Sequence, residues 1–277
     1  MTRRLRLDAE LVRRGLARSR EEAGRLIADG AVSVGGLVAS KSATGVSTDQ
    51  AIVVRADADE PSYASRGAHK LIGALTAFGP HGLRIEGRRC LDAGASTGGF
   101  TDVLLRYGAA TVVAVDVGYG QLAWSLRTDD RVVVHDRTNV RHLSRELIDG
   151  PVDVVTGDLS FISLTVVLPA LCAVASDDAD QILMVKPQFE VGKDRLGKKG
   201  VVRDPALRAE AIEAVCACAA DLGWGTNHLA ASPLPGPSGN VEYFCWLRRD
   251  APPLDTGRAL DVVASGPDGV SGEKVEQ

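Results

Sequence analysis

Cys90-Leu91-Asp92-Ala93-Gly94-Ala95-Ser96-Thr97-Gly98-Gly99-Phe100 is the stretch that decides the fold of this chain. It opens with a short apolar run that suits a buried strand and continues into a turn rich in glycine. Apolar residues with helical spacing follow, at Phe100, Val103, Leu104 and Tyr107. The stretch therefore predicts a strand, a ligand-binding loop and a helix in direct succession.

The acidic residue of this stretch, Asp92, precedes the glycines, and its position limits the ligand. A dinucleotide-binding loop places pyrophosphate on the N-terminus of the following helix, where a carboxylate would repel it. A ligand that is neutral or cationic here fits better, such as S-adenosylmethionine with its sulfonium and amine. Small residues would let it lie close to the backbone. The expected cofactor-binding residues of the loop are Asp92, Gly94, Ala95, Ser96, Gly98, Gly99 and Phe100. A plain tight turn is the alternative.

Strands alternate with helices beyond this loop. The predicted strands cover residues 89–92, 111–115, 131–134, 152–156 and 182–185. This alternation predicts an α/β fold with a parallel, doubly wound, Rossmann-like sheet whose site lies at the carboxyl ends of the strands. Each strand ends at a charged residue, in order Asp92, Asp116, Asp136, Asp158 and Lys186. A last strand, over 241–247, carries Glu242 near its start.

Two of these acids have positions typical of nucleoside recognition. Asp116 follows the second strand, where a carboxylate accepts hydrogen bonds from ribose hydroxyls. Asp136 is expected either to reach the adenine amino group or to cap a loop. Both are therefore candidate cofactor-binding residues, and so is Asp158, which follows the fourth strand.

Residues 1–56 predict a separate small α+β module, with two amphipathic helices and a small sheet. Ser19 and Glu22 have the spacing of a capping box, and Gly35-Gly36 marks a hairpin. The run from Arg18 to Gly36 resembles the S4 RNA-binding domain. The resemblance implies contacts to RNA phosphates by Arg4, Arg6, Arg13, Arg14, Arg18, Arg20 and Arg25. A basic solubilising face is the alternative.

The remaining boundaries follow from composition. Residues 57–64 are a predicted linker, because an acidic run there leads into a proline. The catalytic domain is expected over 65–249, and the acidic segment 250–277, rich in Pro, Gly and Ser, is expected to be disordered. The five cysteines lack the spacing of metal ligands, and no apolar run is long enough for a signal peptide or a membrane span. These features predict a soluble, cytoplasmic protein without metal or membrane contact.

Four charged residues share the predicted rim of the site: Lys70, Asp158, Lys186 and Glu242. This Lys-Asp-Lys-Glu set resembles the tetrad of the S-adenosylmethionine-dependent ribose 2'-O-methyltransferases related to FtsJ. A ribose hydroxyl is a poor nucleophile at neutral pH and needs a base beside it. Lys186 is the expected general base, with the ammonium of Lys70 favouring its neutral form and the two acids fixing its geometry.

The motifs together resemble the TlyA family over residues 3–249. They are the segments 65–70, 92–100, 116–122, 158–163, 186–190 and 239–244. The resemblance implies 2'-O-methylation of cytidine in small- and large-subunit ribosomal RNA, with ribosomal subunits as partners. One departure is Pro61-Ser62-Tyr63-Ala64, where family members carry an Arg-x-Trp stretch. This stretch bears on how RNA docking is coupled to cofactor binding.

Two other functions are compatible with parts of the sequence. A non-catalytic RNA-binding or ribosome-assembly factor would use the S4-like module and keep an inactive methyltransferase fold. A membrane-active hemolysin would need a segment able to enter a bilayer, and the sequence offers no such amphipathic segment. The intact set of four charged residues favours the enzyme.

Overall fold

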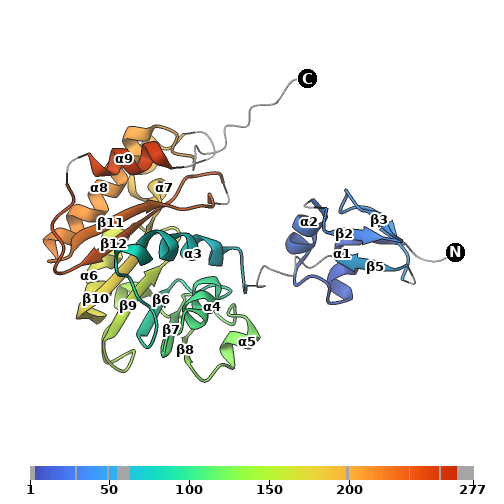
Figure 1. The fold of residues 1–277 in the computed structure, drawn as a ribbon, viewed down its shortest axis with the longest axis horizontal. Helices are drawn as coiled ribbons and strands as arrows, with labels where there is room; N and C mark the ends of the chain where they lie inside the picture. Colours follow the sequence, from blue (N-terminus) through green and yellow to red (C-terminus); the bar gives the residue numbers. More distant parts are fainter. Residues whose placement is uncertain are drawn as a thin grey trace. The chain divides into compact units, whose positions relative to one another are not determined.

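The computed structural model describes residues 4–28, 30–48, 50–54, 63–197, 200–236, 238–255 and 257–266. The chain divides into two compact units, Met1–Ser62 and Tyr63–Gln277 (Figure 1). Most of the predicted linker lies outside the described residues. Its last two residues belong to the second unit, where the Ala64 amide donates to Asp102 Oδ2 over 2.8 Å and the Arg106 guanidinium lies 4.4 Å from the centre of the Tyr63 ring.

The first unit is built from short elements around a small core. They are β1 (Leu5–Arg6), α1 (Leu7–Arg13), α2 (Arg20–Ala28), β2 (Val32–Val34), β3 (Leu37–Val38), β4 (Gly45–Val46) and β5 (Ile52–Val54). Strand β2 pairs antiparallel with β3 and β5, and β1 pairs with β4. The Glu22 amide donates to Ser19 Oγ over 3.1 Å, which confirms the predicted cap of α2. Strands β1 and β4 were missed because two residues carry no periodic pattern.

The second unit contains one large sheet with helices on both faces (Figure 1). Its strands are β6 (Arg89–Ala93), β7 (Thr111–Val115), β8 (Val132–His135), β9 (Val152–Gly157), β10 (Ala175–Val185), β11 (Gly225–Ala231) and β12 (Tyr243–Arg248). Its helices are α3 (Gly67–Phe78), α4 (Gly99–Arg106), α5 (Trp124–Arg127), α6 (Leu164–Val174), α7 (Pro187–Glu190), α8 (Pro205–Asp221) and α9 (Arg258–Ser265). Single 3-10 turns cover Gly79–His81, Val140–His142 and Lys193–Arg195.

The strand order is β11-β12-β10-β9-β6-β7-β8. Strands β6 to β10 are parallel, as the sequence predicts, whereas β12 runs antiparallel between β10 and β11 and makes the sheet mixed. Strand β11 was not predicted, because its sequence does not alternate apolar and polar residues. In the central register Ala93 lies opposite Val115 and Gly157, so Asp116 and Asp158 leave the sheet at the same level.

Alternating side chains of the strands build one apolar core on each face. Leu91 and Ala93 of β6 join the core that α6, α8 and α9 cover, whereas Cys90 joins the core under α3 and α4. Asp92 follows Cys90 by two residues and therefore points to the α4 face. No described helix combines the length and apolarity needed to cross a bilayer.

The segment after residue 249 differs from the sequence expectation. Helix α9 packs against α8 and β11, and its Ala259 is fully buried in the core. The expectation of disorder is therefore wrong for residues 258–265. Tertiary contact stabilises this short helix, because its apolar stripe is too brief to fold alone. Residues 267–277 lie outside the described residues.

Two neighbouring arginines of the first unit give a test of its packing. The Arg14 guanidinium donates to the carbonyls of Ser47, Thr48 and Gln50 and to Glu10, and only 21% of its side chain is exposed. Arg13 also pairs with Glu10, but 54% of its side chain is exposed. Arg14→Ala should lower the stability of this unit by about 2 kcal/mol, because three carbonyls lose their donor.

Arg13→Ala is the matched control and should cost less than about 1 kcal/mol, because the Arg13 side chain is half exposed and Arg14 still pairs with the buried Glu10 carboxylate. Amide hydrogen exchange of peptides from residues 4–54 in the full chain measures both effects. Equal protection in the two variants would contradict a structural role for Arg14.

Candidate active site

Four charged side chains from separate segments converge at the carboxyl ends of the central strands. Lys70 lies on the first turn of α3, Asp158 follows β9, Lys186 follows β10 and Glu242 immediately precedes β12. Lys70 Nζ lies 2.5 Å from Glu242 Oε2 and 4.0 Å from Asp158 Oδ2. Lys186 Nζ lies 2.6 Å from Asp158 Oδ1. The fold thus places all four predicted residues in one continuous chain of ion pairs.

Burial makes these pairs strongly dependent on one another. Lys70, Lys186 and Glu242 are 5%, 6% and 1% exposed, and the Asp158 side chain is 22% exposed. An isolated buried charge is costly, so each ammonium needs its carboxylate. Asp158 contacts both lysines and is the more open acid. The opening of the site therefore lies on the side of Asp158 and Lys186.

The Glu242 carboxylate fits into a backbone cradle. A Cβ atom at Gly236 would lie 2.5 Å from Glu242 Oε1, so a side chain there would displace the carboxylate. Asn240 ties the same strand start to the preceding loop, because its Oδ1 accepts from the Val202 amide over 2.9 Å and its Nδ2 donates to the Gly200 carbonyl over 3.0 Å. These contacts orient Glu242 toward Lys70. The sequence reasoning did not assign a role to Asn240.

Asp92 lies at the bottom of the glycine-rich loop and is fully buried. Thr101 donates to its Oδ2 over 2.7 Å, whereas its Oδ1 is buried without a protein partner. Burial raises the pKa of Asp92 to about 7, against the opposing effect of the Thr101 hydrogen bond. An unpartnered buried carboxylate oxygen fits a cationic ligand group, such as the amine of S-adenosylmethionine. This acceptor is thus suited to the cofactor that the sequence predicts.

The glycines of the loop allow a ligand and Asp158 to approach the same backbone. Gly94 has a φ of +87°, and a Cβ there would lie 3.0 Å from the Asp158 carbonyl oxygen. Gly98 has a φ of +97° and is the N-cap residue of α4, which begins with Gly99 and Phe100. Ala95 is buried and Ser96 is exposed at the loop tip, so these residues follow Asp92 along one edge of the predicted cofactor site.

Asp116 and Asp136 both order neighbouring loops. Asp116 accepts from the Ser96 amide over 2.8 Å and from the Gly118 amide over 2.7 Å, which joins the glycine-rich loop to the loop after β7. Asp136 Oδ2 lies 2.8 Å from Arg127 Nη2 and accepts from the Gly120 amide over 3.3 Å. The Arg127 hydrogen bond lowers the pKa of Asp136. The contacts of Asp136 agree with the loop-capping alternative.

The segment after Asp158 contributes two residues that sequence reasoning left without a role. Lys186 Nζ donates to Ser160 Oγ over 2.9 Å. Phe161 has a φ of +64° and is 92% exposed, with its ring centre 5.4 Å from that of Phe189. The motif Asp158-Leu159-Ser160-Phe161 was visible in the sequence, but its contacts with Lys186 depend on the fold.

Most of the predicted RNA-binding arginines pair with acids of their own unit. Asp8 holds Arg6 and Arg20, Glu10 holds Arg13 and Arg14, and Arg18 pairs with Glu22. Asp8 and Glu10 each face two guanidiniums, so each cluster keeps one positive charge. Arg4 is exposed, and the side chain of Arg25 lies outside the described residues.

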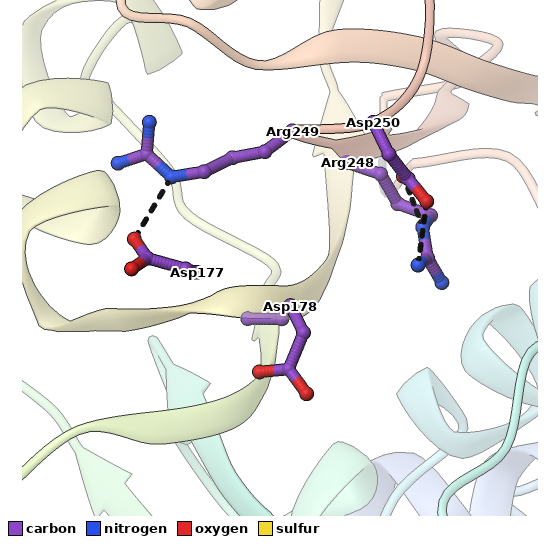
Figure 2. Close-up of a pocket in the computed structure, with 6 residues that line it drawn as sticks. Asp177, Asp178, Arg248, Arg249 and Asp250 are labelled. Carbon is purple, nitrogen blue, oxygen red and sulfur yellow. Dashed lines mark hydrogen bonds and ion pairs between the residues drawn. The ribbon is translucent and has the colours of Figure 1, made fainter.

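A small cavity lies elsewhere in the second unit. It has a volume of about 150 Å³ and is lined by Asp177, Asp178, Ala179, Arg248, Arg249 and Asp250 (Figure 2). Asp177 lies near the start of β10, whereas Lys186 follows its end. The cavity is thus at the opposite end of that strand from the four charged residues, and it is separate from the candidate site.

Comparison with known proteins gives the same two parts. Residues 63–249 match the model of the FtsJ-like methyltransferase family, and residues 5–52 match the S4 domain. The chain is 62% identical to the 16S/23S rRNA (cytidine-2'-O)-methyltransferase TlyA of Mycobacterium tuberculosis over 94% of each chain. It is 36% identical to Hemolysin A of Brachyspira hyodysenteriae, over 87% of this chain and 98% of that protein. A solved structure from Streptococcus thermophilus, provisionally described as a hemolysin, has a TM-score of 0.74 at 36% identity over 96% of each chain.

The raised pKa of Asp92 predicts pH-dependent cofactor binding. Below about pH 7 the buried acid is protonated and cannot balance a cationic amine, whereas above it the carboxylate is available. Affinity for S-adenosylmethionine should therefore rise about tenfold between pH 6 and pH 8. Isothermal titration calorimetry at both pH values measures the change. Asp92→Asn should bind weakly at both, and an equal pH dependence in this variant would contradict the assignment.

Proposed function

The chain belongs to the FtsJ-like methyltransferase family, among the TlyA proteins that carry an S4 domain, and on this premise we propose that Lys186 is the base for methylation of a cytidine 2'-hydroxyl in 16S and 23S ribosomal RNA. The observation that carries the proposal is the continuous contact from Glu242 through Lys70 and Asp158 to Lys186. The ribose hydroxyl is too weak an acid to lose its proton unaided at neutral pH, so the reaction requires a base beside it.

The reaction needs one proton to leave the ribose hydroxyl. S-adenosylmethionine supplies an electrophilic methyl group: the hydroxyl oxygen forms the bond to its carbon, and the electron pair of the broken sulfur–carbon bond stays on sulfur. Lys186 Nζ takes the hydroxyl proton and ends the step as an ammonium. Asp158, 2.6 Å from Lys186, stabilises that ammonium.

Lys70 and Glu242 support this base from the buried side. The Lys70 ammonium lies between Glu242 and Asp158 and offsets part of the negative charge of Asp158 beside Lys186. Glu242 in turn balances the charge of Lys70 in a place that water does not reach. Both residues act through position and electrostatics, since Lys186 rather than Lys70 contacts the exposed Ser160.

Asp92 and Asp116 are the proposed ends of the cofactor site. Asp92 Oδ1 would accept a hydrogen bond from the cofactor amine. Asp116, directly after β7, would accept hydrogen bonds from the ribose hydroxyls. The small residues Gly94, Ala95 and Ser96 lie between them in the glycine-rich loop, and the Ser96 amide donates to Asp116. Gly94 also abuts the Asp158 carbonyl, which would bring the bound methyl group near the base.

The RNA is proposed to meet the protein at two places. Phe161 is almost fully exposed next to Ser160, and an exposed ring there can stack on an unpaired base beside the reacting ribose. The S4 domain would hold RNA phosphates through its clusters of arginines, which supply affinity and orientation. Because the proposed substrate is ribosomal RNA, we infer that the enzyme acts in the cytoplasm.

Two substitutions of Lys186 test whether this residue acts as a base or only as a positive charge. Lys186→Ala removes the base, and Lys186→Arg keeps the charge but cannot give up a proton at neutral pH. Both should lower methyl transfer by at least about a hundredfold, with the Kd for S-adenosylmethionine within about twofold of the wild type. Transfer of labelled methyl to unmodified ribosomal subunits, followed by nucleoside mass analysis, measures the product. Near-normal turnover by Lys186→Arg would exclude Lys186 as the base.

The S4 arginines can be tested without exposing a buried acid. Arg13 and Arg18 have side chains more than half exposed, so Arg13→Gln with Arg18→Gln removes two charges at the surface. RNA binding should weaken, and the slope of log K against log salt should fall by about 1 to 2. Arg84→Gln with Arg141→Gln in the second unit, where both residues are exposed, is the control of equal charge change. An unchanged slope in the double variant would place the phosphate contacts elsewhere.

A further inference from the structure

The amine of Lys186 is held by two oxygens of the same loop. Its Nζ lies 2.6 Å from Asp158 Oδ1 and donates to Ser160 Oγ over 2.9 Å. Lys186 is buried, whereas Ser160 is exposed at the opening of the site. A neutral amine carries two N–H bonds and one lone pair in a tetrahedral arrangement. When both N–H bonds have acceptors, the lone pair keeps a single direction.

We propose that Ser160 is a positioning residue, whose hydroxyl accepts a hydrogen bond from Lys186 and turns the lone pair of that amine toward the ribose hydroxyl. This inference rests on the proposed function, in which Lys186 is the base. One acceptor would leave the amine free to rotate about its 2.6 Å contact with Asp158. A second acceptor fixes the rotation, and correct orientation is a large part of catalysis.

A serine is chemically suited to this task. A second carboxylate at the same place would add negative charge and hold the proton on Lys186, because an opposite charge favours the ammonium form. A hydroxyl oxygen accepts the hydrogen bond without adding charge. Asp158 therefore stabilises the charge that Lys186 gains, and Ser160 fixes the direction of the lone pair of its amine.

Other contacts hold the loop in place without the Ser160 hydroxyl. Glu190, at the end of α7, accepts from the Leu164 amide over 2.9 Å and from the Ser163 hydroxyl over 2.5 Å. The rings of Phe161 and Phe189 make a further contact between the same two segments. Removal of the Ser160 hydroxyl should therefore change one hydrogen bond and leave the loop folded.

The test compares Ser160→Ala with Ser160→Thr in single-turnover methyl transfer to unmodified ribosomal subunits. Ser160→Ala should slow transfer by about 10- to 100-fold, with the Kd values for subunits and S-adenosylmethionine within about twofold of the wild type. Ser160→Thr keeps the hydroxyl and should stay within about threefold of the wild-type rate. A weaker Kd for subunits with an unchanged rate would overturn the proposal and make Ser160 an RNA contact.

Ser160→Ala in a Lys186→Ala background shows whether Ser160 acts through Lys186. The double variant should transfer methyl no more slowly than Lys186→Ala, because the hydroxyl then has no amine to orient. If the double variant transferred methyl another 10- to 100-fold more slowly than Lys186→Ala, about the loss expected of Ser160→Ala alone, the proposal would be overturned while Lys186 remained the base. A wild-type rate in Lys186→Ala alone would overturn the proposed function, and the role of Ser160 with it.

Discussion

The carboxylate of Asp158 is the interaction on which the rest of the site depends. It lies 2.6 Å from Lys186 and 4.0 Å from Lys70, and both lysines are buried. With Glu242 the set contains two lysines and two carboxylates, so the site is neutral as a whole when both lysines are protonated. Loss of any one member leaves a buried charge unpaired, which is far more costly than an exposed pair. The charge at each of the four positions is therefore balanced only when the other three residues are present.

The antiparallel strand β12 is the reason that Glu242 reaches this set. Val185 of β10 lies opposite Tyr243 of β12. Because the two strands run in opposite directions, the residue after β10 and the residue before β12 emerge at the same edge of the sheet. Those residues are Lys186 and Glu242. A wholly parallel sheet would have put the start of the last strand at the far edge, away from the lysines.

Both units use buried carboxylates to organise cations, but for different ends. In the methyltransferase unit the acids are matched one to one with lysines, and the geometry is fixed by burial. In the S4 unit the buried acids Asp8 and Glu10 each hold two arginines and keep a positive surface. The Asp8 and Glu10 pKa values are lowered to about 2 by these guanidiniums, so the clusters persist across the physiological pH range.

The sequence alone determined the two-unit organisation, the parallel strands and the four charged residues, because periodic apolar runs and the residues that end them are local features. It could not determine β11, the direction of β12 or the helix α9, since these depend on packing against residues far away in the chain. The roles of Ser160, Gly236 and Asn240 likewise arise only in the tertiary structure. Each contacts a segment at least five residues away, and no spacing rule relates contacts of that kind to sequence.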